Sequence, residues 1–254
     1  MTDEAVLVVE RQGPVAWVRL NRPRQRNAVN LQLCLDLRAA FTELDGDEDT
    51  RAVLVEGAGP VFCAGADLKE RQGKDAEWVR QRRLASFAAY DAIERCSKPV
   101  IALVHNGIIG SGGEIAMACD FIIAASDAFF TFPETKWGTV GATQRLQRAI
   151  GKRTAKELLF TGRSMPVDEA RLLGLVSRIV EPSALREAGE QTARQIAEAP
   201  ALAVRLTKQS IDLGGRTDQD SGIRIEQAAI EYNLAVGDWQ AGIDKFNEES
   251  SKKS

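Results

Sequence analysis

The segment Gly110-Ser111-Gly112-Gly113-Glu114, followed later by Phe132-Pro133-Glu134, carries the most information about this chain. We expect the glycine-rich residues to open a helix that carries Glu114. A helix start with few side chains leaves backbone N–H groups free to face a negative charge. Two carboxylates beside such a site are able to move protons at the carbon next to a polarised carbonyl. The sequence therefore predicts an enzyme.

Each carboxylate also has a structural interpretation. Ser111 to Glu114 fits the S-x-x-E capping box, in which the Ser and Glu side chains satisfy backbone N–H groups at a helix start. Taken alone, this role is favoured for Glu114, and Glu134 after Pro133 is a common helix opening. However, a helix cap needs only one suitable residue, whereas this segment has three glycines. Each glycine loses backbone entropy on folding, so three of them indicate that another group approaches this backbone closely.

A second loop of small residues, Gly57–Asp67, admits two interpretations as well. It is either a tight strand-to-helix turn capped by Asp67 or the source of a second N–H donor at Ala66. Two donors from separate loops make an oxyanion hole, and losing one typically costs roughly 3 kcal/mol of transition-state stabilisation. The basic loop around Arg24 is either a solvated surface loop or a contact for ligand phosphates.

The composition excludes several classes of protein. With 254 residues, 44% of them hydrophobic, and a net charge of −3, the chain gives no reason to expect a nucleic-acid partner. No apolar run approaches the roughly 20 residues of a membrane helix, and the N-terminus lacks the features of a signal or transit peptide. The four cysteines are far apart and His105 is the sole histidine, so we expect no disulfide framework and no metal site. A cytoplasmic protein fits best.

Apolar strands alternate with helical patterns in the first part of the chain, which indicates an α/β core with mostly parallel strand pairing. A hairpin is expected around Gly13-Pro14. The expected strands are Val6–Val9, Val15–Leu20, Ala52–Val55, Pro99–Val104, Phe121–Ala125 and Leu175–Val180. The expected helices include Leu31–Leu44 with Asn30 as its cap, Ala76–Cys96, a helix from Gly110, Ala155–Leu159 and Val167–Leu173.

The last part of the chain shows only helical periodicity. We therefore predict an α/β core over residues 1–195 and an all-helical region over residues 196–254. The apolar stripes of Ala201–Leu213 and Asp218–Val236 must pack either on the core or on another subunit, and the sequence does not choose between them.

Several motifs, in their order along the chain, resemble the enoyl-CoA hydratase/isomerase (crotonase) superfamily. They are Asn21-Arg22-Pro23 with Asn27-Ala28, Phe62–Leu68, Gly110–Glu114 with Cys119-Asp120, Pro133-Glu134, and Thr143–Leu146. The resemblance extends from the first strands to the final helices. It implies a crotonase-like ββα spiral core whose C-terminal helices mediate assembly into a homotrimer or a hexamer made of two trimers.

The resemblance implies an enoyl-CoA hydratase, which adds water across the 2,3 double bond of a trans-2-enoyl-CoA. Ala66 and Ser111, or Gly112 beside it, would supply the two N–H groups that hold the thioester oxygen. Glu114 would orient and deprotonate the water that attacks C3, and Glu134 would deliver a proton to C2. No metal or redox cofactor is implied, since coenzyme A is part of the substrate.

The same resemblance implies the residues that bind the coenzyme A thioester. Phe246 resembles a late aromatic residue that, in this family, reaches the nucleotide site of a neighbouring subunit. The full set of implied contacts is Arg24, Gln25, Arg26, Ala64, Ala66, Asp67, Leu68 and Phe246.

The chain departs from the family's pattern at its centre. Asn106–Glu114 is one residue shorter than usual, Ser111 replaces a glycine, and Gly138–Arg145 lacks about three residues of the turn that shapes the water site. These departures leave other functions open. They are another acyl-CoA reaction on the same fold (Δ3-Δ2 isomerase, hydrolase or C–C lyase) and a non-catalytic acyl-CoA-binding protein.

Overall fold

A six-stranded sheet forms the centre of the computed structural model, which describes residues 5–237 and 239–251. The strands lie in the order β1-β2-β3-β4-β6-β9. Their bounds are β1 Leu7–Gln12, β2 Val15–Leu20, β3 Ala52–Gly57, β4 Val100–Val104, β6 Phe121–Ala125 and β9 Arg178–Val180. β1 pairs antiparallel with β2, which confirms the predicted hairpin, and every later pairing in this sheet is parallel.

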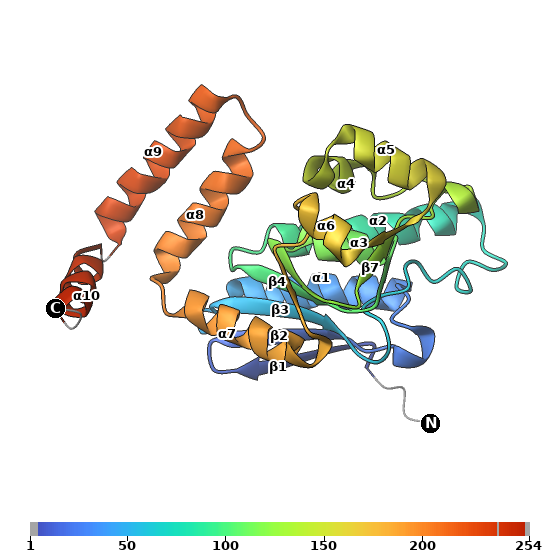
Figure 1. Ribbon diagram of the computed structural model, residues 1–254, viewed down its shortest axis with the longest axis horizontal. Helices are drawn as coiled ribbons and strands as arrows, with labels where there is room; N and C mark the ends of the chain where they lie inside the picture. The colour runs from blue at the N-terminus through green and yellow to red at the C-terminus, as the bar shows by residue number, and fades with distance from the viewer. Residues whose placement is uncertain (1–4, 238, 252–254) are drawn as a thin grey trace.

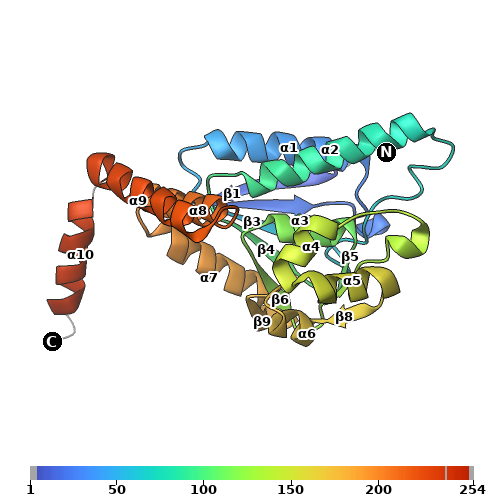
Figure 2. The same cartoon turned by 90° about the horizontal axis from the view of Figure 1, so that it is seen from above.

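Helices cover both faces of this sheet (Figure 2). Helices α1 (Leu31–Gly46) and α2 (Ala76–Glu94) pack on one face, with Val53 and Val55 beneath them. Helix α7 (Leu185–Ala197) packs on the other face, against the alternate residues Ala52 and Leu54. Because successive side chains of a strand point to opposite faces and both faces are covered, the residues Ala52 to Val55 of β3 are all apolar and buried.

A second, three-stranded sheet lies beside the first and was not predicted. It consists of β5 (Gly107–Ile109), β7 (Phe129–Thr131) and β8 (Ser164–Pro166), in that order. This sheet contacts the start of α3 (Ser111–Ala118): Gly110, which precedes the helix, donates its N–H to Thr131 O at the end of β7, at 2.8 Å. The other short elements are the 3-10 turns η1 Pro23–Gln25, η2 Thr135–Trp137 and η3 Pro182–Ala184 and the helices α4 Thr143–Ile150, α5 Lys152–Thr161 and α6 Val167–Leu172.

The C-terminal helices extend away from the core (Figures 1 and 2). They are α8 (Ala201–Gly214), α9 (Gln219–Val236) and α10 (Trp239–Ser251). None of the described residues of α8 or α9 is buried, although both helices carry apolar stripes. The predicted division after residue 195 falls in the last turn of α7, which packs on the sheet, and it stays a prediction. Among the described residues, no helix is long and apolar enough to cross a membrane.

The predicted amphipathic character of α1 is confirmed, as is its cap: Asn30 Oδ1 accepts from Leu33 N–H at 3.0 Å. Phe41 is fully buried under α1, whereas Leu35 on the opposite side of the same helix is 46% exposed. We expect Phe41→Ala to lower the free energy of unfolding by about 3–5 kcal/mol, because it leaves a cavity in the core. Leu35→Ala should change it by less than about 1 kcal/mol. Urea unfolding of both variants checks this, and equal losses would contradict the assigned faces.

Candidate active site

The loop that follows β3 is held by a buried amide. The side chain of Asn27 is fully buried, and its Nδ2 donates to Ala58 O at 2.8 Å, Val61 O at 3.0 Å and Phe62 O at 3.1 Å. Its Oδ1 accepts from Arg22 N–H at 2.9 Å. Asn27 thereby fixes the path of Gly57–Asp67. Asn27 belongs to one of the motifs that carry the family resemblance. Its role in holding the loop could not be predicted, because it depends on three carbonyl groups that come together only in the folded loop.

The next contacts of this loop place Ala66. Val29 N–H donates to Gly65 O at 2.8 Å, and Asp67 N–H donates to Val29 O at 2.9 Å. Ala66 lies between these two bonds, and within the described ranges its own N–H has no partner. The Asp67 carboxylate accepts from the N–H groups of Lys69 and Glu70 and pairs with Arg22 at 3.0 Å. Asp67 therefore stabilises a turn but caps no helix, since Asp75 is the N-cap of α2. The role of Ala66 as a donor to a ligand stays a prediction, and its free N–H is compatible with it.

Helix α3 begins without a side-chain cap. Gly110 is its N-cap residue, Ser111 is the first helical residue, and Glu114 N–H donates to Gly110 O at 3.1 Å. The capping-box interpretation of Glu114 is therefore wrong, because Ser111 lies one position inside the helix. In the described part of the chain, the N–H of Ser111 makes no hydrogen bond, as expected for the first turn of a helix.

Close approach explains the glycines at this helix start. A Cβ added at Gly112 would lie 2.8 Å from Cys63 O, and one added at Gly113 would lie 2.6 Å from the Phe132 ring. Gly110 has a φ of +45°, and a Cβ there would lie 2.7 Å from Glu134 Oε1. Glycine is thus required where the two loops and the second carboxylate meet.

Glu134 does not cap the turn that it precedes. Its side chain makes no capping bond, is only 9% exposed, and its Oε2 atom has no hydrogen-bond partner among the described residues. The helix-opening interpretation of Glu134 is therefore wrong. Burial raises the pKa of Glu134, and the charge of Glu114 raises it further, whereas the backbone N–H of Glu134 itself and the charge of Arg83 oppose the shift.

Glu114 is more buried still, at 3% exposed, and burial raises its pKa. The charges of Arg145 and Arg83 and the nearby N–H of Ala142 oppose this shift and favour the ionised form. Ala142 is buried in a left-handed conformation, with a φ of +56°, at the end of the shortened Gly138–Arg145 turn. The turn therefore contributes a backbone donor beside Glu114 in spite of its missing residues.

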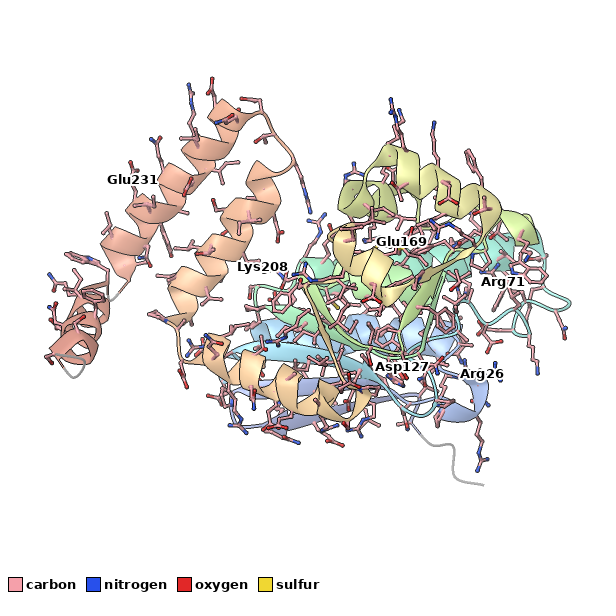
Figure 3. The ribbon with its side chains drawn as sticks, in the orientation of Figure 1. Arg26, Arg71, Asp127, Glu169, Lys208 and Glu231 are labelled. Atoms are coloured by element: carbon pink, nitrogen blue, oxygen red, sulfur yellow. The ribbon has the colours of Figure 1, made fainter. Side chains whose placement is uncertain are left out.

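A cleft, called here the central cleft, joins these groups. It is lined by Ala64, Gly65, Ala66, Leu68, Arg71, Arg83, Ile109, Gly110, Ser111, Pro133, Glu134, Trp137 and Thr139. A second hollow, the basic groove, shares Ala66 and Leu68 with it. The basic groove is lined by Arg22, Arg24, Gln25, Arg26, Ala28, Asn30, Ala66, Asp67, Leu68, Lys69 and Glu70. Arg26 and Arg71 accordingly lie at the same end of the core (Figure 3).

The structure brings most of the predicted site residues together. Ala64, Ala66, Leu68, Ser111 and Glu134 line the central cleft, and Glu114 lies close enough to Glu134 to affect its pKa. The exposed residues Arg24, Gln25 and Arg26, together with Asp67, line the basic groove. The remaining two lie elsewhere: Gly112 packs on Cys63, and Phe246 is 68% exposed on α10, outside both hollows.

Sequence reasoning missed three further side chains at the cleft. Arg71 and Arg83 line it, but nothing in the charged pattern of α2 and the preceding loop marked the residues that face inward. The hydroxyl of Tyr90 is buried near Ser111 and has no hydrogen-bond partner among the described residues. Burial raises the pKa of this hydroxyl.

All four cysteines are free and buried. Cys63, the one nearest the cleft, packs on Gly112, and burial raises the pKa of its thiol to about 12. It is therefore protonated at neutral pH and a poor nucleophile. Over residues 5–237 and 239–251, no cluster of three or more His, Cys, Asp or Glu side chains is arranged to hold a metal ion.

Comparison with known proteins identifies relatives over nearly the whole chain. The family model described as enoyl-CoA hydratase/isomerase matches residues 10–253. The chain is 35% identical over 246 residues to a short-chain-enoyl-CoA hydratase of Clostridium acetobutylicum, covering 95% of this chain and 94% of that protein. It is 36% identical over 246 residues to a crotonyl-CoA hydratase of Syntrophomonas wolfei, covering 95% of each. A crystal structure of an enoyl-CoA hydratase from Bacillus anthracis superposes with a TM-score of 0.93 at 36% identity, covering 96% of each chain.

The raised pKa of Glu134 has a consequence for stability. A buried carboxyl whose pKa is raised destabilises the folded protein once it ionises, so this contribution is absent below the ordinary glutamate pKa of about 4.3 and grows as the pH rises through the raised value. Glu134→Gln cannot ionise, and we expect it to melt at a higher temperature than the unchanged protein at pH 7 but at the same temperature near pH 4.

Glu77→Gln on α2 is the matched control. The pKa of Glu77 is lowered by hydrogen bonds from Arg80 and Gln81, so its replacement should leave the melting temperature at pH 7 unchanged or lower it. A lower melting temperature for Glu134→Gln at pH 7 would contradict the description of Glu134 as a buried, unpartnered carboxyl.

Proposed function

This chain belongs to the enoyl-CoA hydratase/isomerase family, and we propose that it adds water across the 2,3 double bond of a trans-2-enoyl-CoA. The observation that supports this most directly is the pair of buried glutamates, Glu114 and Glu134, beside a cleft that also holds the free donors of Ala66 and Ser111. Isomerisation of a double bond needs one proton-transferring group, whereas hydration uses two.

The two backbone donors would stabilise the charge that develops on the thioester oxygen. When hydroxide adds to C3, electrons move through C2 to this oxygen, which becomes enolate-like. The N–H groups of Ala66 and Ser111 come from separate loops and need no reorganisation to face it. Ser111 fits this role better than Gly112, because Ser111 lines the central cleft while Gly112 packs on Cys63.

The two glutamates have environments that favour different protonation states. Arg145, Arg83 and the N–H of Ala142 favour ionised Glu114, which suits the base that takes a proton from the attacking water. Glu134 has a buried oxygen without a partner, and the charge of Glu114 raises its pKa, which suits the acid that delivers a proton to C2. Pairs of carboxyls whose environments separate their pKa values commonly divide acid and base roles in this way.

The basic groove would bind the coenzyme A moiety. Arg24 and Arg26 are exposed there and form no ion pair within the described structure, so both are available to phosphate groups. The pantetheine arm would then pass Ala66 and Leu68, which the groove shares with the central cleft. The reaction draws on no redox cofactor, since coenzyme A is part of the substrate. The cytoplasmic location stays a prediction.

We expect Glu114→Gln and Glu134→Gln each to lower kcat for crotonyl-CoA hydration by at least about 100-fold, because each removes a proton-transfer group. The measurement is the loss of enoyl-thioester absorbance. Affinity for butyryl-CoA, measured by calorimetry, should change little, because glutamine keeps the shape of the site. Glu77→Gln is the control with full activity expected. Unchanged hydration in either active-site variant would contradict the assigned roles.

The exposed helices α8 to α10 support assembly into a homotrimer or a hexamer made of two trimers. Helix α9 exposes the large apolar side chains Ile230 (52%), Leu234 (53%) and Val236 (59%). Exposed apolar surface of this kind commonly marks a protein–protein contact. In such an assembly, Phe246 would contact the basic groove of a neighbouring copy, as its place on α10 outside both hollows allows.

Light scattering after gel filtration tests the assembly. We expect the unchanged protein to have three or six times the 27.7 kDa mass of the chain, and Ile230→Asp combined with Leu234→Asp to shift it toward the monomer. Glu231→Gln, on the same turn of α9, should leave the mass unchanged. A monomeric unchanged protein would contradict the proposal.

A further inference from the structure

Two cationic side chains line the central cleft without a carboxylate partner. They are Arg71, in the loop before α2, and Arg83, on α2 itself. No ion pair joins either guanidinium to a carboxylate among the described residues. In the proposed hydration reaction the charge of Arg83 favours ionised Glu114. Neither arginine is needed at the reacting atoms themselves, because backbone donors would hold the thioester oxygen and the glutamates would hold the water.

Of the two arginines, Arg71 is the one with a buried nitrogen atom, Nε, that lacks a hydrogen-bond partner in the described part of the chain. Burial lowers the pKa of Arg71, and the nearby charges of Arg82 and Arg83 lower it further. A buried donor without a partner and two like charges close by both cost free energy, which a bound anion would offset.

Arg82 shows what a structural arginine looks like at this position. Its buried guanidinium donates to Ser86 Oγ at 3.0 Å and to Val29 O, and its Nε lies 3.6 Å from Glu70 Oε2. It thereby ties α2 to the loop that carries Ala66. The Nε of Arg82, like that of Arg71, has no hydrogen-bond partner among the described residues, so the two arginines differ in their other contacts. Arg71 and Arg83 have no comparable set of partners, so the same explanation does not account for them.

The position of Arg83 indicates where the anion would lie. Its Nη2 donates to Val140 O at 2.6 Å, which uses one of its five donors, and its charge acts on both Glu114 and Glu134. Its Nη1 lies on the same side of the cleft as Glu134, since a Cβ added at Gly141 would be 3.4 Å from Glu134 Oε1 and 3.5 Å from Arg83 Nη1. Because the two glutamates would flank C2 and C3 of the substrate, Arg83 would lie beside these carbons. An anionic group on the acyl chain near C5 would meet it there.

We propose that the substrate is an enoyl-CoA whose acyl group carries its own carboxylate, one or two carbons beyond the double bond, held between Arg71 and Arg83. This inference rests on the proposed hydratase function and narrows its substrate class. Arginine guanidinium groups present paired donors that match the two oxygens of a carboxylate. The phosphates of coenzyme A have a separate set of cations, Arg24 and Arg26 in the basic groove, on the other side of Leu68.

The test compares two substrates that differ in charge and little in shape. The first is the coenzyme A thioester of trans-2-pentenedioic acid, linked through the conjugated carboxyl. The second is 5-methyl-trans-2-hexenoyl-CoA, in which an isopropyl group replaces the free carboxylate. We expect kcat/KM for the carboxylate substrate to exceed that for the neutral one by at least about 10-fold, as a charge-assisted hydrogen bond typically provides.

Single variants then assign the preference to the arginines. Arg71→Gln and Arg83→Gln should each lower the ratio of the two kcat/KM values by about 10-fold or more. Arg80→Gln is the matched control, because Arg80 lies on α2 at 62% side-chain exposure and pairs only with Glu77. It should leave the ratio unchanged.

The outcomes separate this inference from the proposed function. If the unchanged protein hydrates the neutral substrate as well as or better than the charged one, the inference is overturned while the hydratase function stands. Equal losses for both substrates in Arg71→Gln and Arg83→Gln would also overturn it. They would limit Arg83 to its effect on the ionisation of Glu114 and would assign Arg71 to coenzyme A binding or to structure. If the unchanged protein hydrates neither substrate nor crotonyl-CoA, the proposed function itself fails.

Discussion

The site depends on the close contact between the start of α3 and the loop that follows β3. A side chain at Gly112 would come within 2.8 Å of Cys63 O, so this contact exists only with glycine. The same approach brings Ser111 and Ala66 into one cleft, each with an N–H group that makes no hydrogen bond within the described residues. Asn27 and the pairing of Val29 with the loop hold the other side in place. These backbone contacts therefore position two N–H groups that themselves remain free to bind a ligand.

The carboxylates add a second constraint, because both are buried where ionisation is unfavourable. Nearby cations and the N–H of Ala142 support the charge on Glu114, while Glu134 keeps a buried oxygen without a partner. This asymmetry costs stability and is compatible with the proposed division into one acid and one base, because perturbed pKa values cluster at functional sites. The shortened turn after Gly138 keeps this arrangement because Ala142 adopts a left-handed conformation there.

The sequence predicted those elements whose signals are local. The short continuous apolar run Phe121–Ala125 was predicted with its observed bounds, and the cap at Asn30 was visible one residue before the helix. Strands of three residues, such as Gly107–Ile109, carry too few residues for a periodic signal and form only because partners from distant segments lie beside them. For the same reason the strand expected over Leu175–Val180 is confined to Arg178–Val180, where β6 provides a pairing edge.

At the site, the residue types were predictable and their contacts were not. The capping-box interpretation of Glu114 depended on which residue ends the preceding strand, a shift of one position that the sequence leaves open. Arg71 and Arg83 belong to a charged stretch in which most neighbours face solvent, and only the folded cleft shows that these two line it. Asn27 acts through carbonyls about 30 residues away, a relation that requires the folded loop.

Infrared difference spectroscopy of bound butyryl-CoA, carrying carbon-13 at the thioester carbon, tests the central claim most directly. This saturated thioester cannot be hydrated, so its carbonyl reports only on the donors that face it. Two backbone N–H groups converging on the oxygen should polarise the carbonyl and move its stretching band to lower wavenumber than in water. A band at the same or higher wavenumber would show that Ala66 and Ser111 do not meet at this atom.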